Sequence, residues 1–133
     1  MAKQRKHEPL YTLNIFPVYD DATKQERIIF LVQTVRIFIH FRYEIVLQDS
    51  VENNEIHLKI LGLHVPSILL PQQGPAVGRR EYERFEGSYK LIVTKQDGAL
   101  NEFEINFQRN TVTMVSQPKN PFILVSIAPA PLQ

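Results

Sequence analysis

The 133-residue chain contains no cysteine. Its absence excludes a disulfide framework, thiol catalysis and thiolate metal sites, and it fits a reducing compartment. Long apolar runs are missing too, because the longest unbroken one covers only residues 28–32, far short of a membrane span. The basic N-terminus is not followed by the apolar segment and cleavage site of a signal peptide. We therefore expect a cytoplasmic protein with no membrane contact.

A basic excess is missing as well, since the formal net charge is only +1. Lys3, Arg5, Lys6 and Glu8 place a net charge of +2 in the first eight residues, which leaves −1 for the rest of the chain. A nucleic-acid-binding domain normally carries a clear basic excess, because it must replace phosphate counterions. The composition therefore argues against a nucleic-acid partner, and residues 1–8 are predicted to form a basic, flexible tail.

What the chain does contain is an alternation of apolar and polar residues, which is typical of half-buried strands. The odd positions of residues 35–47 are apolar, which predicts one long strand. The even positions of residues 56–60 are apolar and predict the next strand. Matching the two apolar faces sets Leu47 opposite Ile56 in an antiparallel hairpin.

A second hairpin is predicted from residues 85–95 and 99–108, which alternate in the same way. The residues between them suit a three-residue loop in which Gly98 takes the left-handed conformation. This loop sets Leu91 opposite Phe103.

Residues 22–36 fit two patterns. Thr23 and Glu26 have the spacing of a capping box, and apolar residues recur on one helical face. The segment is nevertheless rich in β-branched residues, which favour a strand. We favour a strand that enters after a turn at residues 20–21 and bends near residues 33–34.

With further strands at 111–115 and 121–128, the pattern predicts an all-β fold. We expect a single-domain antiparallel β-sandwich of about eight or nine strands over residues 9–128. A small closed β-barrel is the alternative, because both folds need one apolar face per strand. The proline-rich residues 129–133 are predicted to form a C-terminal tail.

No pattern of residues indicates catalysis. Nucleophile elbows, S-x-x-K and H-E-x-x-H motifs are all absent from the sequence. Of the four histidines, His40 and His57 fall far apart on the predicted strands, which does not suit a zinc site. We expect a protein that is not an enzyme, with no catalytic residues, no metal and no cofactor.

The stretch GPAVGRREYERFEG, residues 74–87, contains two glycines and three arginines. Its glycine spacing is one residue short of a phosphate-binding P-loop, and the Lys-Ser/Thr pair of that loop is absent. Each arginine is matched by a glutamate, so the segment is neutral. Continuing the next strand backwards would bury several of these charges. We therefore expect the strand to begin near Phe85, after an irregular segment.

Residues 66–84 are predicted to form a long loop rich in proline and glycine. Loops of this length in compact domains often carry function. The predicted binding residues in it are Arg79, Arg80, Tyr82 and Arg84. The leading hypothesis is a non-catalytic binding or assembly module that contacts a protein partner, or a second copy, through this loop or a sheet edge. The alternative is a carrier of a small apolar ligand, if the strands close into a barrel.

Overall fold

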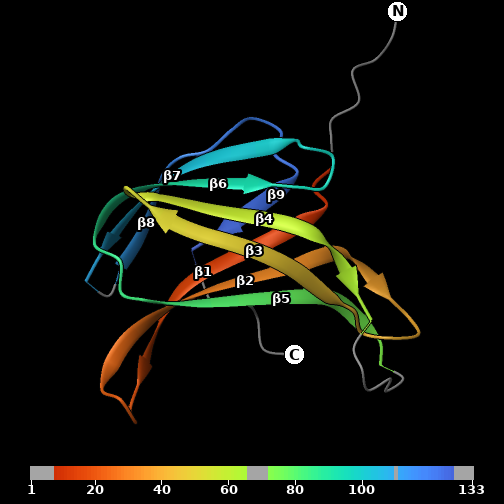
Figure 1. Ribbon diagram of the computed structural model, residues 1–133, viewed down its shortest axis with the longest axis horizontal. Helices are drawn as coiled ribbons and strands as arrows, with labels where there is room; N and C mark the ends of the chain where they lie inside the picture. Colours follow the sequence, from red (N-terminus) through yellow and green to blue (C-terminus); the bar gives the residue numbers. More distant parts are fainter. Residues whose placement is uncertain (1–7, 66–71, 110, 128–133) are drawn as a thin grey trace, which may run out of the picture.

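A computed structural model of the protein describes residues 8–65, 72–109 and 111–127. This part of the chain contains nine strands and no helix. The strands form one mixed sheet that curls into a half-barrel (Figure 1). The strands are β1 (Tyr11–Asp20), β2 (Gln25–Phe38), β3 (Glu44–Glu52), β4 (Glu55–His64), β5 (Gly74–Glu83), β6 (Gly87–Thr94), β7 (Leu100–Gln108), β8 (Thr111–Ser116) and β9 (Ile123–Ser126). The predicted tails, apart from Glu8, lie outside the described residues.

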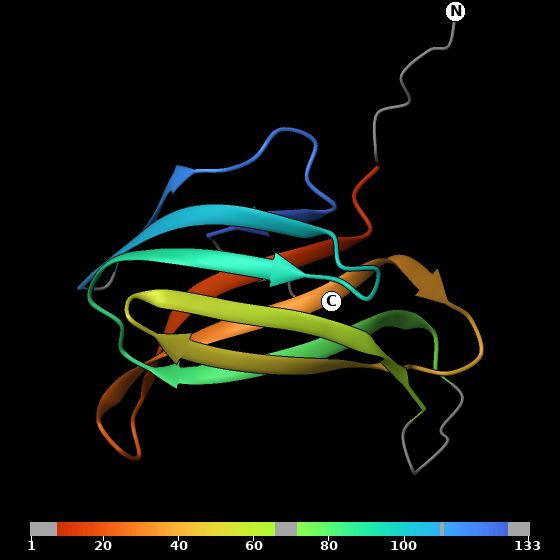
Figure 2. The ribbon, with the colours of Figure 1, turned by 45° about the horizontal axis from the view of Figure 1, so that its top comes forward.

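The all-β prediction is confirmed, but the sheet is not purely antiparallel as predicted. Its order is β8-β7-β6-β4-β3-β5-β2-β1-β9. The pairs β1–β9, β4–β6 and β3–β5 run parallel. β5 does not pair with β4 but lies between β3 and β2, and β6 returns to the free side of β4 and pairs with it in parallel, as Figure 2 shows. The described residues contain no helix that is long and apolar enough to cross a membrane.

One face of the curled sheet encloses the core. The alternation seen in the sequence fills this inner face with apolar side chains from eight of the strands, and no charged or polar residue of the described chain is fully buried. Phe30, Phe103 and Phe107 are the largest of these side chains, each at most 1% exposed. Burial of apolar surface is the main stabilising contribution to such a fold.

The strand interpretation of residues 22–36 is confirmed. β1 and β2 form an antiparallel hairpin, in which the Asp20 carboxylate accepts a hydrogen bond from the Ala22 amide at 3.0 Å. The predicted bend is also present, because the register of β2 against β5 shifts between Gln33 and Ile37. An irregularity of this kind bends the strand locally.

The single long strand predicted over residues 35–47 is wrong. β2 ends at Phe38 and β3 begins at Glu44, and the two strands are not neighbours, because β5 lies between them. The intervening chain turns a corner at which the rings of Phe38 and Tyr43 meet edge to face, with their centroids 4.8 Å apart. Both rings pack against the core. The predicted apolar face does not continue across the break, because Val35, Ile37 and Ile39 are 52%, 50% and 68% exposed.

The predicted β3–β4 register is also wrong, by four residues. Leu47 lies opposite Ile60, and Ile56 lies opposite Val51. Asn53 and Asn54 form a two-residue turn with φ of 50° and 62°, the left-handed values that a type I′ turn requires. The predicted register keeps the same faces buried, because a shift by an even number leaves every side chain on its own side.

Asn54→Gly is expected to stabilise the protein by about 0.5 kcal/mol. Glycine relieves the left-handed strain at this position, while it also increases the freedom of the unfolded chain. Asn54→Ala is the matched control and should destabilise by about 1 kcal/mol, because alanine gains none of the local hydrogen bonds that let asparagine tolerate this conformation. Urea unfolding of the three proteins measures both values. Equal stability of the two variants would contradict the turn assignment.

The second hairpin follows the prediction. Leu91 lies opposite Phe103, and Gly98 has a φ of 90°. The loop is closed by a hydrogen bond from the Lys95 amide to the Ala99 carbonyl at 3.0 Å. The predicted strands near the C-terminus are present as β8 and β9.

Candidate binding surfaces on β5 and at the sheet edge

The stretch Gly74–Gly87 is not the end of a loop. Residues 74–83 form β5, which pairs with β2, and the chain breaks at residues 84–86 before β6 begins. The predicted loop 66–84 is therefore wrong over β5, while residues 66–71 lie outside the described part. The burial of charge that argued against a strand here does not arise, because β5 and β6 are separate strands with independent alternation. Arg79, Glu81 and Glu83 are exposed, on the face opposite the buried Ala76.

β5 meets β3 closely at one end only. A single parallel bridge joins Glu44 to Val77, supported by a hydrogen bond from the Val77 amide to the Tyr43 carbonyl at 3.2 Å. Continuing this register sets Leu47 beside Arg80 and Asp49 beside Tyr82. No backbone pairing between the two strands follows beyond the bridge in the described residues, so the β3–β5 seam depends on side chains there.

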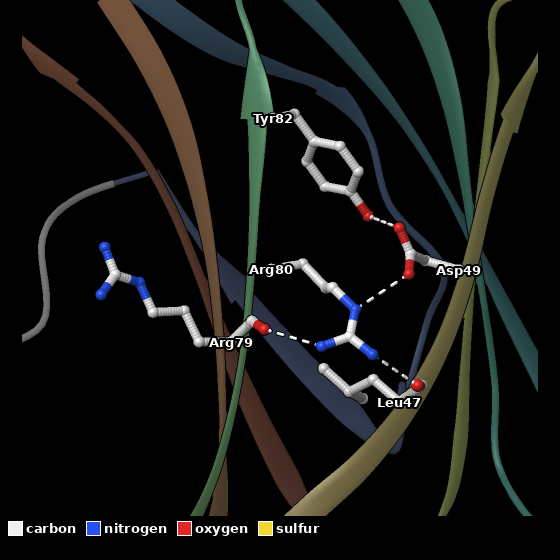
Figure 3. Close-up of polar contacts among 5 residues, drawn as sticks. All are labelled: Leu47, Asp49, Arg79, Arg80 and Tyr82. Atoms are coloured by element: carbon white, nitrogen blue, oxygen red, sulfur yellow. Dashed lines mark hydrogen bonds and ion pairs between the residues drawn. The ribbon is translucent and has the colours of Figure 1, made fainter.

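The side chain of Arg80 spans this seam (Figure 3). Its Nε donates to the Asp49 carboxylate at 2.9 Å, and its Nη2 donates to the Leu47 carbonyl at 2.7 Å. Nη1 donates to the carbonyl of Arg79 at 3.0 Å. The hydroxyl of Tyr82 donates to the second Asp49 oxygen at 2.5 Å. Arg80, Asp49 and Tyr82 therefore form a network that joins β3 to β5, which we call the seam network.

The seam network perturbs the ionisation of two of its members. Burial opposes the charge on Asp49, but hydrogen bonds from Tyr82 and Arg80 outweigh it and lower the pKa of the carboxyl group. Burial raises the pKa of the Tyr82 hydroxyl, and its hydrogen bond to the Asp49 carboxylate adds to this effect. Both shifts favour the state shown, in which a protonated phenol donates to an ionised carboxylate.

The ring of Tyr82 is fixed from its other side by aromatic packing. Its centroid lies 5.2 Å from Phe30 and 5.3 Å from Phe85. Phe85 continues the cluster to Tyr89 and Phe107, at 5.0 and 5.2 Å. The irregular segment after β5 thus packs Phe85 against Tyr82, and the hydroxyl of Tyr82 is held at Asp49 by a rigid scaffold.

The structure brings together only two of the four predicted binding residues. Arg80 and Tyr82 share Asp49, whereas Arg79 extends away from the seam network (Figure 3). On the outer face Glu81 lies 2.6 Å from Arg27 and 3.8 Å from Arg79. Arg84 pairs with Glu86 at 3.1 Å. The predicted local neutralisation of the arginines is therefore present at Arg79 and Arg84, and a binding role for the four residues stays a prediction.

Sequence reasoning missed Asp49, although it holds the network together. Asp49 is 31 positions from Arg80, and only the placement of β5 beside β3 brings the two together. The one available signal was an acidic residue at an inward position of a strand, which needs a charged or hydrogen-bonding partner.

The sheet has one edge strand of appreciable length. β8 pairs with β7 on one side, while β1 comes near it across the curled sheet without a backbone hydrogen bond to it in the described residues. Its residues, Thr-Val-Thr-Met-Val-Ser, carry no charge and no proline. Val115 is 55% exposed and stands where the β7–β8 register shifts. The opposite edge, β9, has only four residues.

An open hollow of about 310 Å³ adjoins the end of β8. Ser116, Gln117 and Pro118 form one wall, and Lys90, Glu102 and Glu104 lie on the other. No group of three or more histidine, aspartate or glutamate side chains in the described ranges is arranged to hold a metal ion. Among the ion pairs of the described residues, His57 takes part in one, with the Glu55 carboxylate 3.0 Å from its Nε2 atom.

No protein-family model matches this chain, and neither the curated proteins nor the solved structures contain a match to it. The interpretation of its surfaces therefore depends on their geometry and chemistry alone.

Proposed function

We propose that this protein is a non-catalytic assembly module that binds another polypeptide by adding a strand to the free edge of β8. The partner we put to the test is a second copy of the chain. The observation that carries the proposal is the uncharged edge of β8. Natural sheets normally blunt such an edge with lysine, proline or a very short strand, and β8 has six residues and neither blocking residue type.

The sequence of β8 suits pairing with itself. A twofold axis through Thr113 in an antiparallel pair would set Val112 opposite Met114 of the other copy, so that residues of the same face meet. Val112 and Met114 both pack at the margin of the core. The pair would therefore extend the apolar inner face across the interface, while threonines meet on the outer face.

The absence of cysteine is consistent with a cytoplasmic location, because the reducing cytosol does not favour disulfides. The carrier alternative would need a closed barrel with an empty apolar interior. The inner positions of the sheet are occupied by fully buried side chains, so we do not propose this second function.

Thr113→Lys is the direct test, because a charge on the edge opposes strand addition. We expect the wild-type protein to show a concentration-dependent dimer in size-exclusion chromatography with light scattering, and Thr113→Lys to remain monomeric. Ser50→Lys is the matched control, since Ser50 is also exposed but lies on the central strand β3, and it should dimerise like the wild type. A wild-type protein that stays monomeric up to about 1 mM, a dissociation constant at which association is already weak, would contradict self-assembly.

A further inference from the structure

A second surface lies at the corner between β2 and β3, far from the edge of β8 in the order of the sheet. Arg36 places its guanidinium carbon 5.0 Å from the centre of the Phe38 ring. Phe38 pairs with Gly74 in the sheet. Arg42 covers the same glycine, because a Cβ atom added to Gly74 would lie 3.3 Å from the Arg42 Nε. Two arginines thus converge on the Phe38–Gly74 pair.

Neither arginine forms an ion pair with an acidic residue of the described chain. This distinguishes them from Arg27, Arg79, Arg80 and Arg84, each of which lies within 4.0 Å of a carboxylate. The nearest acidic residue in sequence, Glu44, lies opposite His64 in the β3–β4 register. The corner therefore carries two uncompensated positive charges.

Arg42 also lacks a hydrogen bond, because its Nε is buried and has no acceptor in the described part of the chain. A buried donor without an acceptor loses its hydration and gains nothing in return. Such groups are rare in folded proteins and each calls for an explanation, of which a bound ion is one. An oxyanion bound to the Arg42 guanidinium neutralises its charge, and it becomes the acceptor for the Nε once the side chain shifts away from Gly74.

We propose that Arg36 and Arg42 form a binding site for a small ligand that carries a carboxylate or phosphate group next to an aromatic or apolar body. The guanidinium fork matches the spacing of two oxyanion oxygens. The rings of Phe38 and Tyr43 are only partly buried and meet edge to face beside Arg36, so they offer apolar contact to the body of the ligand.

The probes are phenyl phosphate, benzoate and inorganic phosphate, titrated into the ¹⁵N-labelled full chain at constant ionic strength. The readout is the side-chain Nε–H signal of Arg42. We expect a saturable shift with a dissociation constant on the order of 1 mM or lower for phenyl phosphate. Binding by inorganic phosphate should be weaker, because it makes no contact with the rings. Benzoate and phenyl phosphate together tell whether the site prefers the carboxylate or the phosphate.

Arg42→Gln is expected to weaken phenyl phosphate binding about tenfold or more, the size expected when a charge-assisted hydrogen bond is lost; its backbone amide signals serve as the readout. Gly74→Ala keeps every charge but moves the Arg42 guanidinium, so it should weaken binding as well. Arg84→Gln removes an arginine that already has a partner in Glu86, and it should bind like the wild type. Circular dichroism confirms that each variant is folded.

No saturable shift up to about 20 mM, far weaker than the millimolar affinity expected, would overturn the proposal. So would equal loss of affinity in Arg42→Gln and Arg84→Gln, because a general effect of charge would then explain the binding. The test is independent of β8, since Thr113→Lys should leave it unchanged.

Discussion

Gly78→Ala is expected to destabilise the protein by about 2–3 kcal/mol, the cost of overpacking a tight contact. A Cβ atom at this position would lie 2.9 Å from the Ile45 carbonyl oxygen and 3.0 Å from both the Ile45 Cβ and the Leu47 Cδ1. The backbone oxygen of a central strand cannot rotate away as a flexible side chain does. The added methyl group must therefore push β5 from β3, next to their single backbone bridge.

Gly74→Ala is the matched control for this prediction. Its Cβ would meet only the Arg42 guanidinium, at 3.3 Å or more, and that side chain can move. Its stability should stay within about 1 kcal/mol of the wild type, since an alanine also restricts the unfolded chain. Urea unfolding compares the two variants. If Gly78→Ala lost no more stability than Gly74→Ala, the close approach of β5 to β3 would be wrong.

How well the sequence predicts each feature depends on how far apart in the chain the interacting residues lie. The β6–β7 hairpin was predicted with its register because only five residues separate the strands and Gly98 fixes the loop conformation. The β3–β4 hairpin was not, because alternation has a period of two and cannot distinguish registers that differ by four residues. Only the chemistry of the Asn53–Asn54 turn carried that information.

β5 was taken for a loop because its signals compete. Glycine and proline are depleted in strands, and Gly74, Pro75 and Gly78 stand in its first half. Their presence has a structural reason at Gly78, where β3 approaches too closely for any side chain. The residues that weakened the strand signal are thus among those that position the strand.

The seam network could not be predicted, because it depends on the order of the sheet. Arg80 and Tyr82 were selected for their residue types and position, but their partner Asp49 is known only once β5 is placed beside β3. The same holds for Arg36 and Arg42, whose convergence depends on the corner after β2 and on Gly74. Within most strands the alternation in the sequence indicates which residues face inward, although Val35, Ile37 and Ile39 are exposed against this pattern. The topology decides which of the inward residues meet.

Asp49→Ala is expected to cost about 2–3 kcal/mol, because it leaves the Arg80 Nε and the Tyr82 hydroxyl without their acceptor. The side chain of Asp49 is 23% exposed and that of Arg80 is 38% exposed, so water replaces part of what is lost. Glu81→Ala is the matched control. It removes a carboxylate from the exposed outer face of β5, where an ion pair contributes at most about 1 kcal/mol.

The stability that is lost when Asp49 is replaced should also depend on pH, in the direction set by the lowered pKa of the Asp49 carboxyl group. Because the folded state lowers the pKa of this carboxyl group below its usual 3.8, the ionised form stabilises the protein. This contribution is complete well above pH 3.8 and is lost as the pH falls through the folded pKa. The difference in unfolding free energy between wild type and Asp49→Asn should therefore be constant from about pH 5 to 8 and decrease below about pH 4. A difference that does not change down to pH 2 would contradict an ionised Asp49 that accepts hydrogen bonds from Arg80 and Tyr82, and with it the assignment of the seam network as the link between β3 and β5.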